Sequence, residues 1–176
     1  MLKALIALTL AATGTGIVHA QALPTATRLA EAQVGVTYVN GRSDYSQKRF
    51  NGFGFYGDLD FRHGIGVEAA FHYMSDGQPK GIYERTYEIG GRYSRRYGRF
   101  QPYGKFMVGR GVFNFPGDQA NLAYNLYAFG GGTDYRVLPF LNVRVDYEAQ
   151  KWLSGPLLQN GLSPSLLSVG AAYHFK

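Results

Sequence analysis

The chain has 176 residues, among them 24 glycines, 14 tyrosines and 12 phenylalanines, and it contains no cysteine. The lack of cysteine excludes disulfide bonds, thiolate chemistry and cysteine-ligated metal sites. A formal net charge of +6 often accompanies nucleic-acid binding, but the basic residues fall mainly in expected loops of a chain whose N-terminus predicts export. We therefore expect no nucleic acid, and favour a phosphate-rich lipid surface as partner.

The first segment, residues 1–20, has the organisation of a secretory signal peptide. Lys3 supplies the positive charge, Ala4 to Ala12 form an apolar run, and Val18-His19-Ala20 forms a small-x-small cleavage site. Ala20-Gln21-Ala22 is a second possible site one step on. An N-terminal membrane anchor is the alternative, but the apolar run is short for a membrane-crossing helix.

The remainder predicts an all-β domain over residues 29–176, preceded by a flexible tail at 21–28. Apolar and polar residues alternate with the period of two that half-buried strands require, and the abundance of glycine and aromatic residues favours strands over helices. We expect eight strands: Ala30–Val39, Gly52–Phe61, Ile65–Met74, Tyr83–Tyr93, Phe100–Gly111, Ala123–Arg136, Leu141–Trp152 and Ser165–Phe175.

The expected connections alternate in length along the chain. Short links fall at residues 62–64, 94–99 and 137–140, and longer ones at 40–49, 75–82, 112–122 and 153–164. Short turns at one end and long loops at the other are typical of an antiparallel up-and-down transmembrane β-barrel, with both chain ends on the periplasmic side.

The size of the apolar side chains predicts which face of the strands points outward. A soluble barrel around an apolar ligand would show the same alternation inverted, and a sandwich core is a further alternative. The interior of an eight-stranded barrel is only just wide enough for side chains to fill, so it cannot hold the many rings of the apolar face. That face carries Val34, Val36, Tyr38, Phe53, Phe55, Leu59, Phe61, Ile65, Val67, Phe71, Tyr73, Tyr87, Ile89, Tyr93, Tyr127, Phe129 and Tyr135.

The opposite face consists of small residues punctuated by charges, which fits a narrow lumen. The small residues are Gly52, Gly54, Gly66, Ala70, Gly90, Gly130 and Gly132. Tyrosines near strand ends are expected to form the interfacial girdles of a membrane barrel: Tyr38, Tyr56, Tyr73, Tyr83, Tyr93, Tyr135 and Tyr147.

Charged residues on the inward face predict a network of ion pairs, because buried charges require partners or water. The acids are Glu31, Asp58, Asp60, Glu68, Glu88, Asp134, Asp146 and Glu148, and the bases are Arg92, Lys105, Arg136 and Arg144, with His72 and His174 as titratable additions. We single out Glu68, Arg92, Lys105, Asp134, Arg144 and Asp146 as a gate or a plug, and the narrow lumen favours the plug. Because acids outnumber bases, any residual conduction should prefer cations.

The C-terminal segment, Ser168 to Phe175, combines an alternating strand with a spaced set of residue types. Its pattern of polar, x, Gly, x, x, aromatic, x, aromatic is carried by Ser168, Gly170, Tyr173 and Phe175. It resembles the insertion signal of bacterial outer-membrane β-barrel proteins, although Lys176 follows the usual terminal aromatic. The resemblance implies the barrel assembly machinery and periplasmic chaperones as partners.

Further segments resemble the transmembrane domain of the OmpA-like family: Gly66-Val67-Glu68-Ala69-Ala70-Phe71, Asp134-Tyr135, Arg144-Val145-Asp146-Tyr147 and Leu167 to Phe175. The resemblance implies that Glu68, Asp134, Arg144 and Asp146 correspond to an interior network whose switching salt bridges gate a small pore. The family's gate lysine would fall near Gly90, and the closest base on that face is Arg92. The switch is therefore expected to be absent or rewired while the plug remains.

Basic residues in and beside the long loops are candidates for contact with lipopolysaccharide phosphates, which arginine binds in bidentate fashion. They are Arg42, Lys48, Arg49, Lys80 and Arg110. Solvated loop charges are the alternative. Arg110 lies between two glycines, where a bulge could change its direction, so its facing stays open.

These features favour a monomeric barrel of the bacterial outer membrane with a structural role in envelope integrity and at most weak ion conduction. A loop-mediated adhesin is the alternative. A lipid-modifying enzyme would need His72, Ser75 and Asp76 in contact, but Ser75-Asp76-Gly77 is also an ordinary turn composition. We expect no enzyme. The four scattered histidines form no metal motif, and no cofactor is expected.

Overall fold

The computed structural model describes residues 30–45, 48–79, 81–115, 117, 120–153 and 160–175. The predicted signal peptide (1–20) and tail (21–28), together with Lys80 and Lys176, lie outside the described residues. Within those residues, no helix has the length and apolarity needed to cross a membrane.

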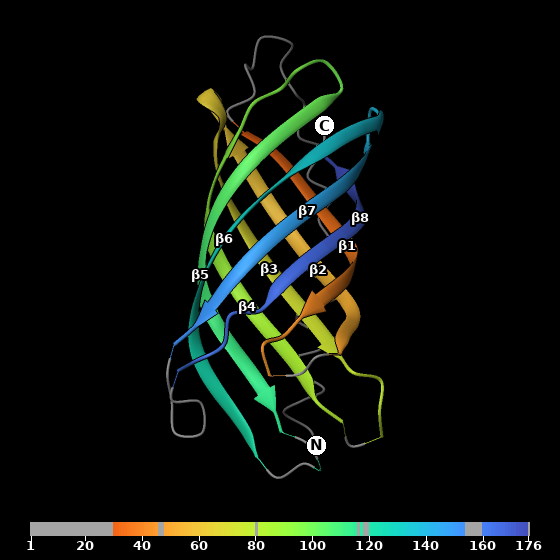
Figure 1. Ribbon diagram of the computed structural model, residues 1–176. Helices are drawn as coiled ribbons and strands as arrows, with labels where there is room; N and C mark the ends of the chain where they lie inside the picture. Colours follow the sequence, from red (N-terminus) through yellow and green to blue (C-terminus); the bar gives the residue numbers. More distant parts are fainter. Residues whose placement is uncertain are drawn as a thin grey trace, which may run out of the picture.

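The described residues form eight antiparallel strands that close into a barrel in simple sequence order (Figure 1). The strands are β1 (Ala30–Arg42), β2 (Arg49–Phe61), β3 (Ile65–Ser75), β4 (Tyr83–Ser94), β5 (Phe100–Asn114), β6 (Asn121–Leu138), β7 (Leu141–Trp152) and β8 (Ser165–His174). A short 3-10 turn, η1 (Arg62–Gly64), joins β2 to β3. The eight-stranded up-and-down barrel predicted from the sequence is confirmed.

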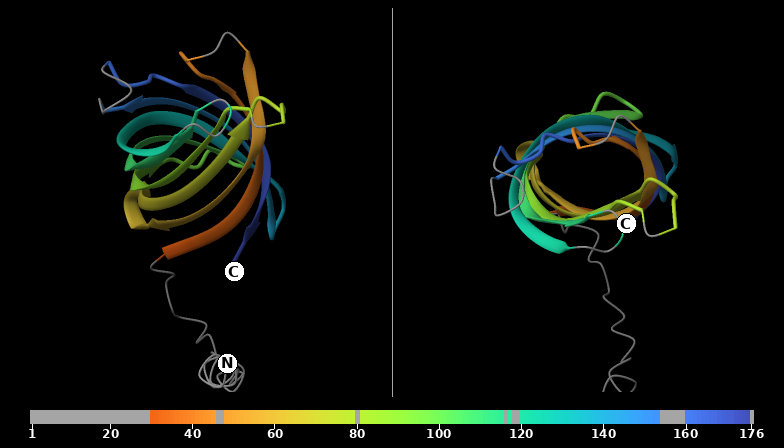
Figure 2. Two further views of the ribbon diagram at one scale, coloured as in Figure 1. Left: turned by 90° about the horizontal axis from the view of Figure 1, so that it is seen from below. Right: turned by 60° about the horizontal axis from the view of Figure 1, so that its bottom comes forward.

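Closure depends on β1, which pairs with β2 on one side and with β8 on the other. Gln33 lies opposite His174, and the backbone N–H of Phe175 still donates to the carbonyl of Ala32 at 3.0 Å beyond the end of β8. A closed ring leaves no strand edge unpaired, which matters where no water is present to satisfy backbone groups. Figure 2 shows the ring of strands from two further directions.

Several strands extend past the predicted ends, mainly toward the long loops. β1 continues to Arg42, which pairs with Arg49, so the first long loop shrinks to residues 43–48. At the β1–β2 hairpin most of the added residues are polar, and the Asn40 side chain donates to Asn51 Oδ1 at 2.7 Å. Apolar residues such as Phe50 and Phe113 are added as well. The predicted strands were too short because apolar–polar alternation identifies only the part of a strand that has one apolar face. Backbone pairing between strands continues beyond that part.

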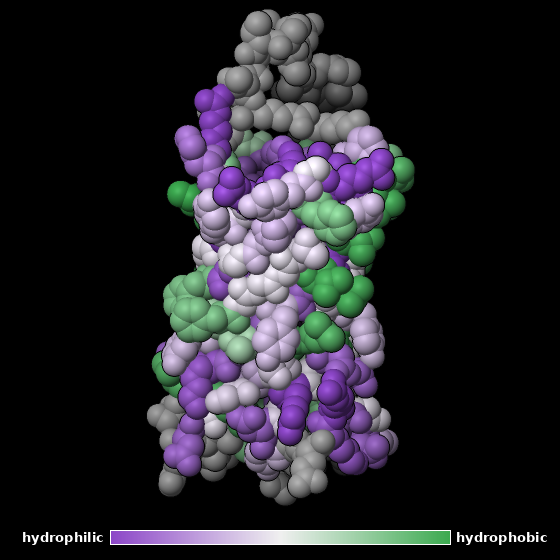
Figure 3. Space-filling view, turned by 45° about the horizontal axis from the view of Figure 1, so that its top comes forward, coloured by the Kyte–Doolittle hydropathy of each residue, from purple (hydrophilic) through white to green (hydrophobic). Residues whose placement is uncertain are grey.

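The outward face is apolar over the middle of the barrel, as predicted. Ile89 is 62% exposed and Phe129 is 60% exposed, and rings of neighbouring strands pack together, as Phe55 and Phe71 do with centroids 6.4 Å apart. On the face seen in Figure 3, weakly polar and hydrophobic side chains occupy the middle and hydrophilic ones gather toward both ends. We call this zone the apolar band.

The interior departs from the prediction at the long-loop end. Instead of small and charged residues throughout, this half holds an apolar plug of fully or nearly fully buried side chains: Val39, Phe50, Met74, Met107, Phe113, Leu126, Trp152 and Leu166. The large rings fit because glycines lie against them. A Cβ on Gly111 would come within 2.5 Å of the Trp152 ring.

The prediction of the interfacial tyrosines is also wrong at one position. Tyr56 points into the barrel, only 7% exposed, because its place in β2 has the opposite parity to Phe53 and Phe55. Tyr38, Tyr93 and Tyr147 are outward and exposed, as expected.

If the apolar band lies in lipid, an arginine should be costly at its centre and tolerated at its rim. We expect Ile89→Arg to lower the free energy of unfolding by about 2–4 kcal/mol, and Ser75→Arg, at the end of β3, by about 0–1 kcal/mol. Urea titration of the refolded variants in lipid vesicles measures both. Equal losses for the two variants would contradict the assigned depth.

Candidate functional site in the barrel lumen

Between the apolar plug and the short-turn end, the lumen is filled by a network of buried charges. Strand alternation directs side chains from six strands toward the barrel axis, where carboxylates surround three basic residues: Arg92, Lys105 and Arg144. We define the ion-pair network as Asp58, Asp60, Glu68, Arg92, Lys105, Asp134, Arg144, Asp146 and Glu148, all buried.

Arg144, on β7, lies at the centre of the network. Its guanidinium donates to Asp58 Oδ2 at 2.7 Å and to Glu68 Oε2 at 2.9 Å, from Nη2 and Nη1 respectively. Its Nε donates to Asp134 Oδ1 at 2.7 Å. The same group lies 3.8 Å from the centroid of the Tyr56 ring, a distance at which cation–π attraction adds to the ion pairs.

Arg92, on β4, binds many of the same carboxylates from the opposite wall. Its ion pairs span 2.5–3.2 Å and reach Asp58, Asp60, Glu68 and Asp134. Two guanidinium groups thus hold one set of acids, with the Tyr103 ring 4.2 Å from one and 4.7 Å from the other. A buried pair of this kind is strongly coupled, because losing one partner leaves uncompensated charge.

Lys105, on β5, forms the third centre. Its Nζ lies 3.0 Å from Glu68 Oε1, 3.0 Å from Asp146 Oδ1 and 2.9 Å from Glu148 Oε2. The Tyr103 hydroxyl donates to Asp146 Oδ2 at 2.6 Å. Glu68 therefore joins the arginine and lysine centres, and all six residues singled out from the sequence fall in one network.

The OmpA-like resemblance placed the missing gate lysine near Gly90. The backbone there leaves no room for a side chain, because a Cβ on Gly90 would come within 2.0 Å of the Phe106 carbonyl oxygen. Both Arg92 and Lys105 contact Glu68 instead. The expected rewiring around Glu68 thus involves a base from β5 as well as the one from β4.

Uncharged polar residues complete the network and were missed in the sequence. Gln33 Nε2 donates to Asp58 Oδ2 at 3.0 Å and to Asp134 Oδ2 at 2.9 Å, and Asn142 donates to Gln33 Oε1 at 2.7 Å. Inward strand parity would have found these residues. Glu84, fully buried beside the plug, was also missed, although its position on the inward face of β4 would have identified it. Neither of its carboxylate oxygens has a hydrogen-bond partner in the structure.

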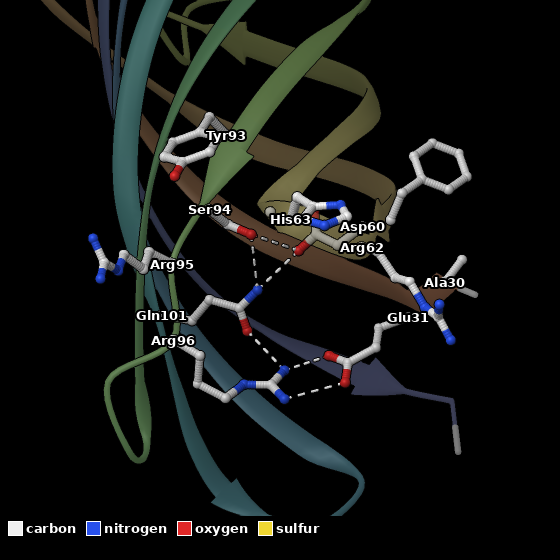
Figure 4. Close-up of a pocket in the computed structure, with 12 residues that line it drawn as sticks. Ala30, Glu31, Asp60, Arg62, His63, Tyr93, Ser94, Arg95, Arg96 and Gln101 are labelled. Carbon is white, nitrogen blue, oxygen red and sulfur yellow. Dashed lines mark hydrogen bonds and ion pairs between the residues drawn. The ribbon is translucent and has the colours of Figure 1, made fainter. Parts of the chain in front are cut away.

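The short-turn end opens into a cavity of about 430 Å³ (Figure 4). Here Glu31 is paired with Arg96, which also donates to Gln101 Oε1 at 3.1 Å. Gln101 donates in turn to Asp60 Oδ2 at 2.8 Å. The hydrogen bonds from Arg96 to Glu31 raise the pKa of the guanidinium.

Of the acids and bases predicted for the network, Glu88 is buried but lies outside the set defined above, and two others lie outside it at the short-turn end. Glu31 is part-exposed at this mouth rather than deep in the lumen, and Arg136 lines a separate cavity nearby with Arg99 and His174. Both are close to strand ends, where inward parity no longer means burial.

The catalytic alternative does not assemble in the described residues. His72 is buried in the lumen beside Thr86, with 3.2 Å between Nδ1 and Oγ1. Ser75 lies on the opposite face of β3, and Asp76 accepts a hydrogen bond from the Gln78 backbone at 3.1 Å. An odd spacing of three along a strand separates His72 from Ser75.

The basic candidates at the long-loop end are exposed where they are described: Arg42, Lys48, Arg49 and Arg110. Arg110 points outward in regular register, opposite Tyr87 and Asn125, so the bulge considered at this position is absent. The register shift in the described strands falls instead at Arg136/Leu138.

The C-terminal signal residues have the predicted facing. Tyr173 and Phe175 are exposed on the outward side. Ser168 is buried on the inward side, and Gly170 lies on the same side, half-buried. Their role in assembly stays a prediction.

A family model described as the outer membrane protein beta-barrel domain matches residues 7–175 of the chain. Among curated protein sequences, none matches at a significant level.

Solved structures share the fold. Neisserial surface protein A is 14% identical, with 84% of this chain and 98% of that chain covered at a TM-score of 0.63. The N-terminal β-barrel domain of Pseudomonas aeruginosa OprF is 11% identical, covering 81% and 97% at 0.58. The attachment invasion locus protein Ail of Yersinia pestis is 18% identical, covering 83% and 97% at 0.55.

The position of Arg144 predicts a large effect of its removal. Arg144→Met would remove one cationic partner from each of three buried carboxylates and leave the acids in excess, so we expect a loss of about 3–5 kcal/mol in the free energy of unfolding. Arg96→Met, which breaks a part-exposed pair, should cost about 0–1 kcal/mol. Urea unfolding monitored by tryptophan fluorescence compares the two; similar losses would contradict the central role of Arg144.

Proposed function

The chain belongs to the outer membrane protein β-barrel domain family and is a protein of the bacterial outer membrane, and from this premise we propose that it acts as a closed, monomeric structural barrel of the envelope. The long loops then face the exterior and the short turns the periplasm. Its contribution to envelope integrity would come from a rigid, lipid-embedded wall rather than from transport.

The observation that carries this proposal is the presence of two barriers in series along the axis. The apolar plug blocks the outer half, with Phe50, Met107 and Trp152 fully buried. The ion-pair network blocks the periplasmic half, with Arg144 bonded across the lumen to β2 and β3 and also to the neighbouring strand β6. A hydrated ion passing through would have to displace both.

Any leak should carry cations. The buried inward carboxylates are eight, namely Asp58, Asp60, Glu68, Glu84, Glu88, Asp134, Asp146 and Glu148, whereas the buried arginines and lysines of the described lumen are three, namely Arg92, Lys105 and Arg144. An excess of acids along a path selects cations.

Series barriers give a specific expectation for conductance. In planar bilayers we expect the wild type, Glu68→Ala, Arg144→Ala and Trp152→Ala each to show at most rare, small conductance steps, because at least one barrier is intact in every case. Arg144→Ala combined with Trp152→Ala should show frequent cation-selective steps. Long-lived open steps from the wild-type protein would contradict the closed barrel.

The partner that the outward surface fits best is lipopolysaccharide. Arg85 pairs with Val112 and Arg110 with Tyr87, so the two arginines are diagonal neighbours on the outward face of β4 and β5. They lie where the apolar band ends, and within the described residues neither forms an ion pair. Arginines in this position can bind lipid phosphates in bidentate fashion. Arg110 belongs to the predicted candidate set with Arg42, Lys48, Arg49 and Lys80, and Arg85 adjoins it.

Removing both guanidinium groups should weaken lipopolysaccharide binding. We expect Arg85→Ser/Arg110→Ser to lower the apparent affinity at least about tenfold, since a hydrogen bond to a charged group contributes roughly 1.5–3 kcal/mol. The matched control, Arg95→Ser/Arg99→Ser, removes two periplasmic arginines. Titration of labelled lipopolysaccharide into nanodiscs measures the affinities, and equal behaviour of the two double variants would contradict this surface.

A loop-mediated surface interaction is the second candidate, and the β1–β2 hairpin favours it. Arg42 and Arg49 are register partners, and Lys48 and Tyr45 are exposed beside them. Ail has been solved in complex with the heparin analogue sucrose octasulfate. If this hairpin binds sulfated polysaccharides, Arg42→Ser/Arg49→Ser should elute from heparin at clearly lower salt than the wild type.

Assembly is expected to use the C-terminal strand. The outward rings of Tyr173 and Phe175 would be recognised by the barrel assembly machinery, with periplasmic chaperones as earlier partners.

A further inference from the structure

We propose that His72, Glu88 and Glu148 form a binding site for one divalent transition-metal cation inside the barrel. Folding brings one ligand atom from each of these residues to within 4.8 Å of the others. They come from β3, β4 and β7, and all three are buried. A single ion there would tie together three strands from opposite walls.

The ligands are held in place by neighbouring side chains. Gln150 Nε2 donates to Glu88 Oε1 and to Glu148 Oε1, each at 2.8 Å, and so sets the two carboxylates side by side. Trp152 Nε1 donates to Gln150 Oε1 at 2.8 Å and fixes that amide. Outer contacts of this kind orient ligands in known metal sites.

An unsatisfied buried oxygen points independently to cation binding at this cluster. Glu88 Oε2 is buried, in a side chain with 0% exposure, and has no hydrogen-bond partner in the structure. A buried carboxylate oxygen without a donor is costly. His72 Nδ1 lies 3.4 Å from the other oxygen of the same carboxylate, Oε1, so the unsatisfied group belongs to the cluster itself.

The local charge balance points the same way. Lys105 is shared among Glu68, Asp146 and Glu148, and Glu88 forms no ion pair with an arginine or lysine in the described residues. With Lys105 retained by Glu68 and Asp146, Glu148 can turn toward a cation without leaving the lysine unpaired.

The donor set selects the class of ion. One imidazole nitrogen and two carboxylate oxygens suit Zn²⁺ and similar cations, whereas Mg²⁺ and Ca²⁺ prefer oxygen alone. Two ligands at about 2.1 Å from a tetrahedral zinc lie about 3.4 Å apart, so the most widely spaced ligand atoms need to close by up to about 1.4 Å through side-chain rotation. The plug and the network on either side imply that the ion is acquired during folding.

The experiment is refolding of the full chain into detergent with ZnCl₂ present, followed by desalting and measurement of zinc by mass spectrometry. We expect about one zinc per wild-type chain, held by three protein ligands with water as the fourth. His72→Ala and Glu88→Gln should retain less than a fifth of that amount. Refolding with MgCl₂ should leave no retained metal.

His63→Asn is the matched control. The substitution removes an exposed imidazole at the periplasmic turn. Residue 63 has a backbone φ of 69°, which asparagine tolerates, so the variant should fold and retain the wild-type amount of zinc. Glu88→Gln keeps the shape of the side chain and removes its charge. If His72→Ala fails to fold, the zinc retained by Glu88→Gln still tests the proposed site. Zinc should also raise the melting temperature of the wild type and not that of Glu88→Gln. Equal zinc in wild type and Glu88→Gln, or none in the wild type, would overturn the proposal.

Discussion

The narrowness of an eight-stranded barrel is the constraint on which the other features depend. Its interior is filled by side chains alone, so every inward residue must pack against or pair with another. Bulky apolar residues in excess of that space, such as Ile89 and Phe129, have to lie outside, where only lipid can cover them. Closure of β1 on β8 makes this arrangement possible, because it leaves no unpaired strand edge in the membrane.

The same constraint gives the lumen two chemically distinct layers. At the long-loop end, glycines such as Gly111 make room for large rings such as Trp152. Toward the short turns, charges fill the space instead, and Arg144 and Arg92 share the acids Asp58, Glu68 and Asp134. Breaking such a pair is costly because it leaves a buried charge, which explains how a polar interior can be rigid rather than a water path.

Strand periodicity predicted a large part of this arrangement, and its failures have physical reasons. Alternation correctly assigned Glu68 to the lumen and Phe129 to lipid, since facing depends only on parity. Parity does not tell how polar the interior is at each depth, so the burial of Phe50 and Trp152 in an apolar layer was missed. The meeting of His72, Glu88 and Glu148 depends on the register of strands β3, β4 and β7 around the ring, which no local pattern encodes.

The closed lumen is tested most directly by the accessibility of its centre to water. The chain contains no cysteine, so Met107→Cys, at a fully buried plug position, provides a single thiol. In lipid vesicles, the folded variant should resist a water-soluble maleimide from either side, and the urea-unfolded chain should react fully. Rapid labelling of the folded barrel would show a hydrated axis and contradict the account.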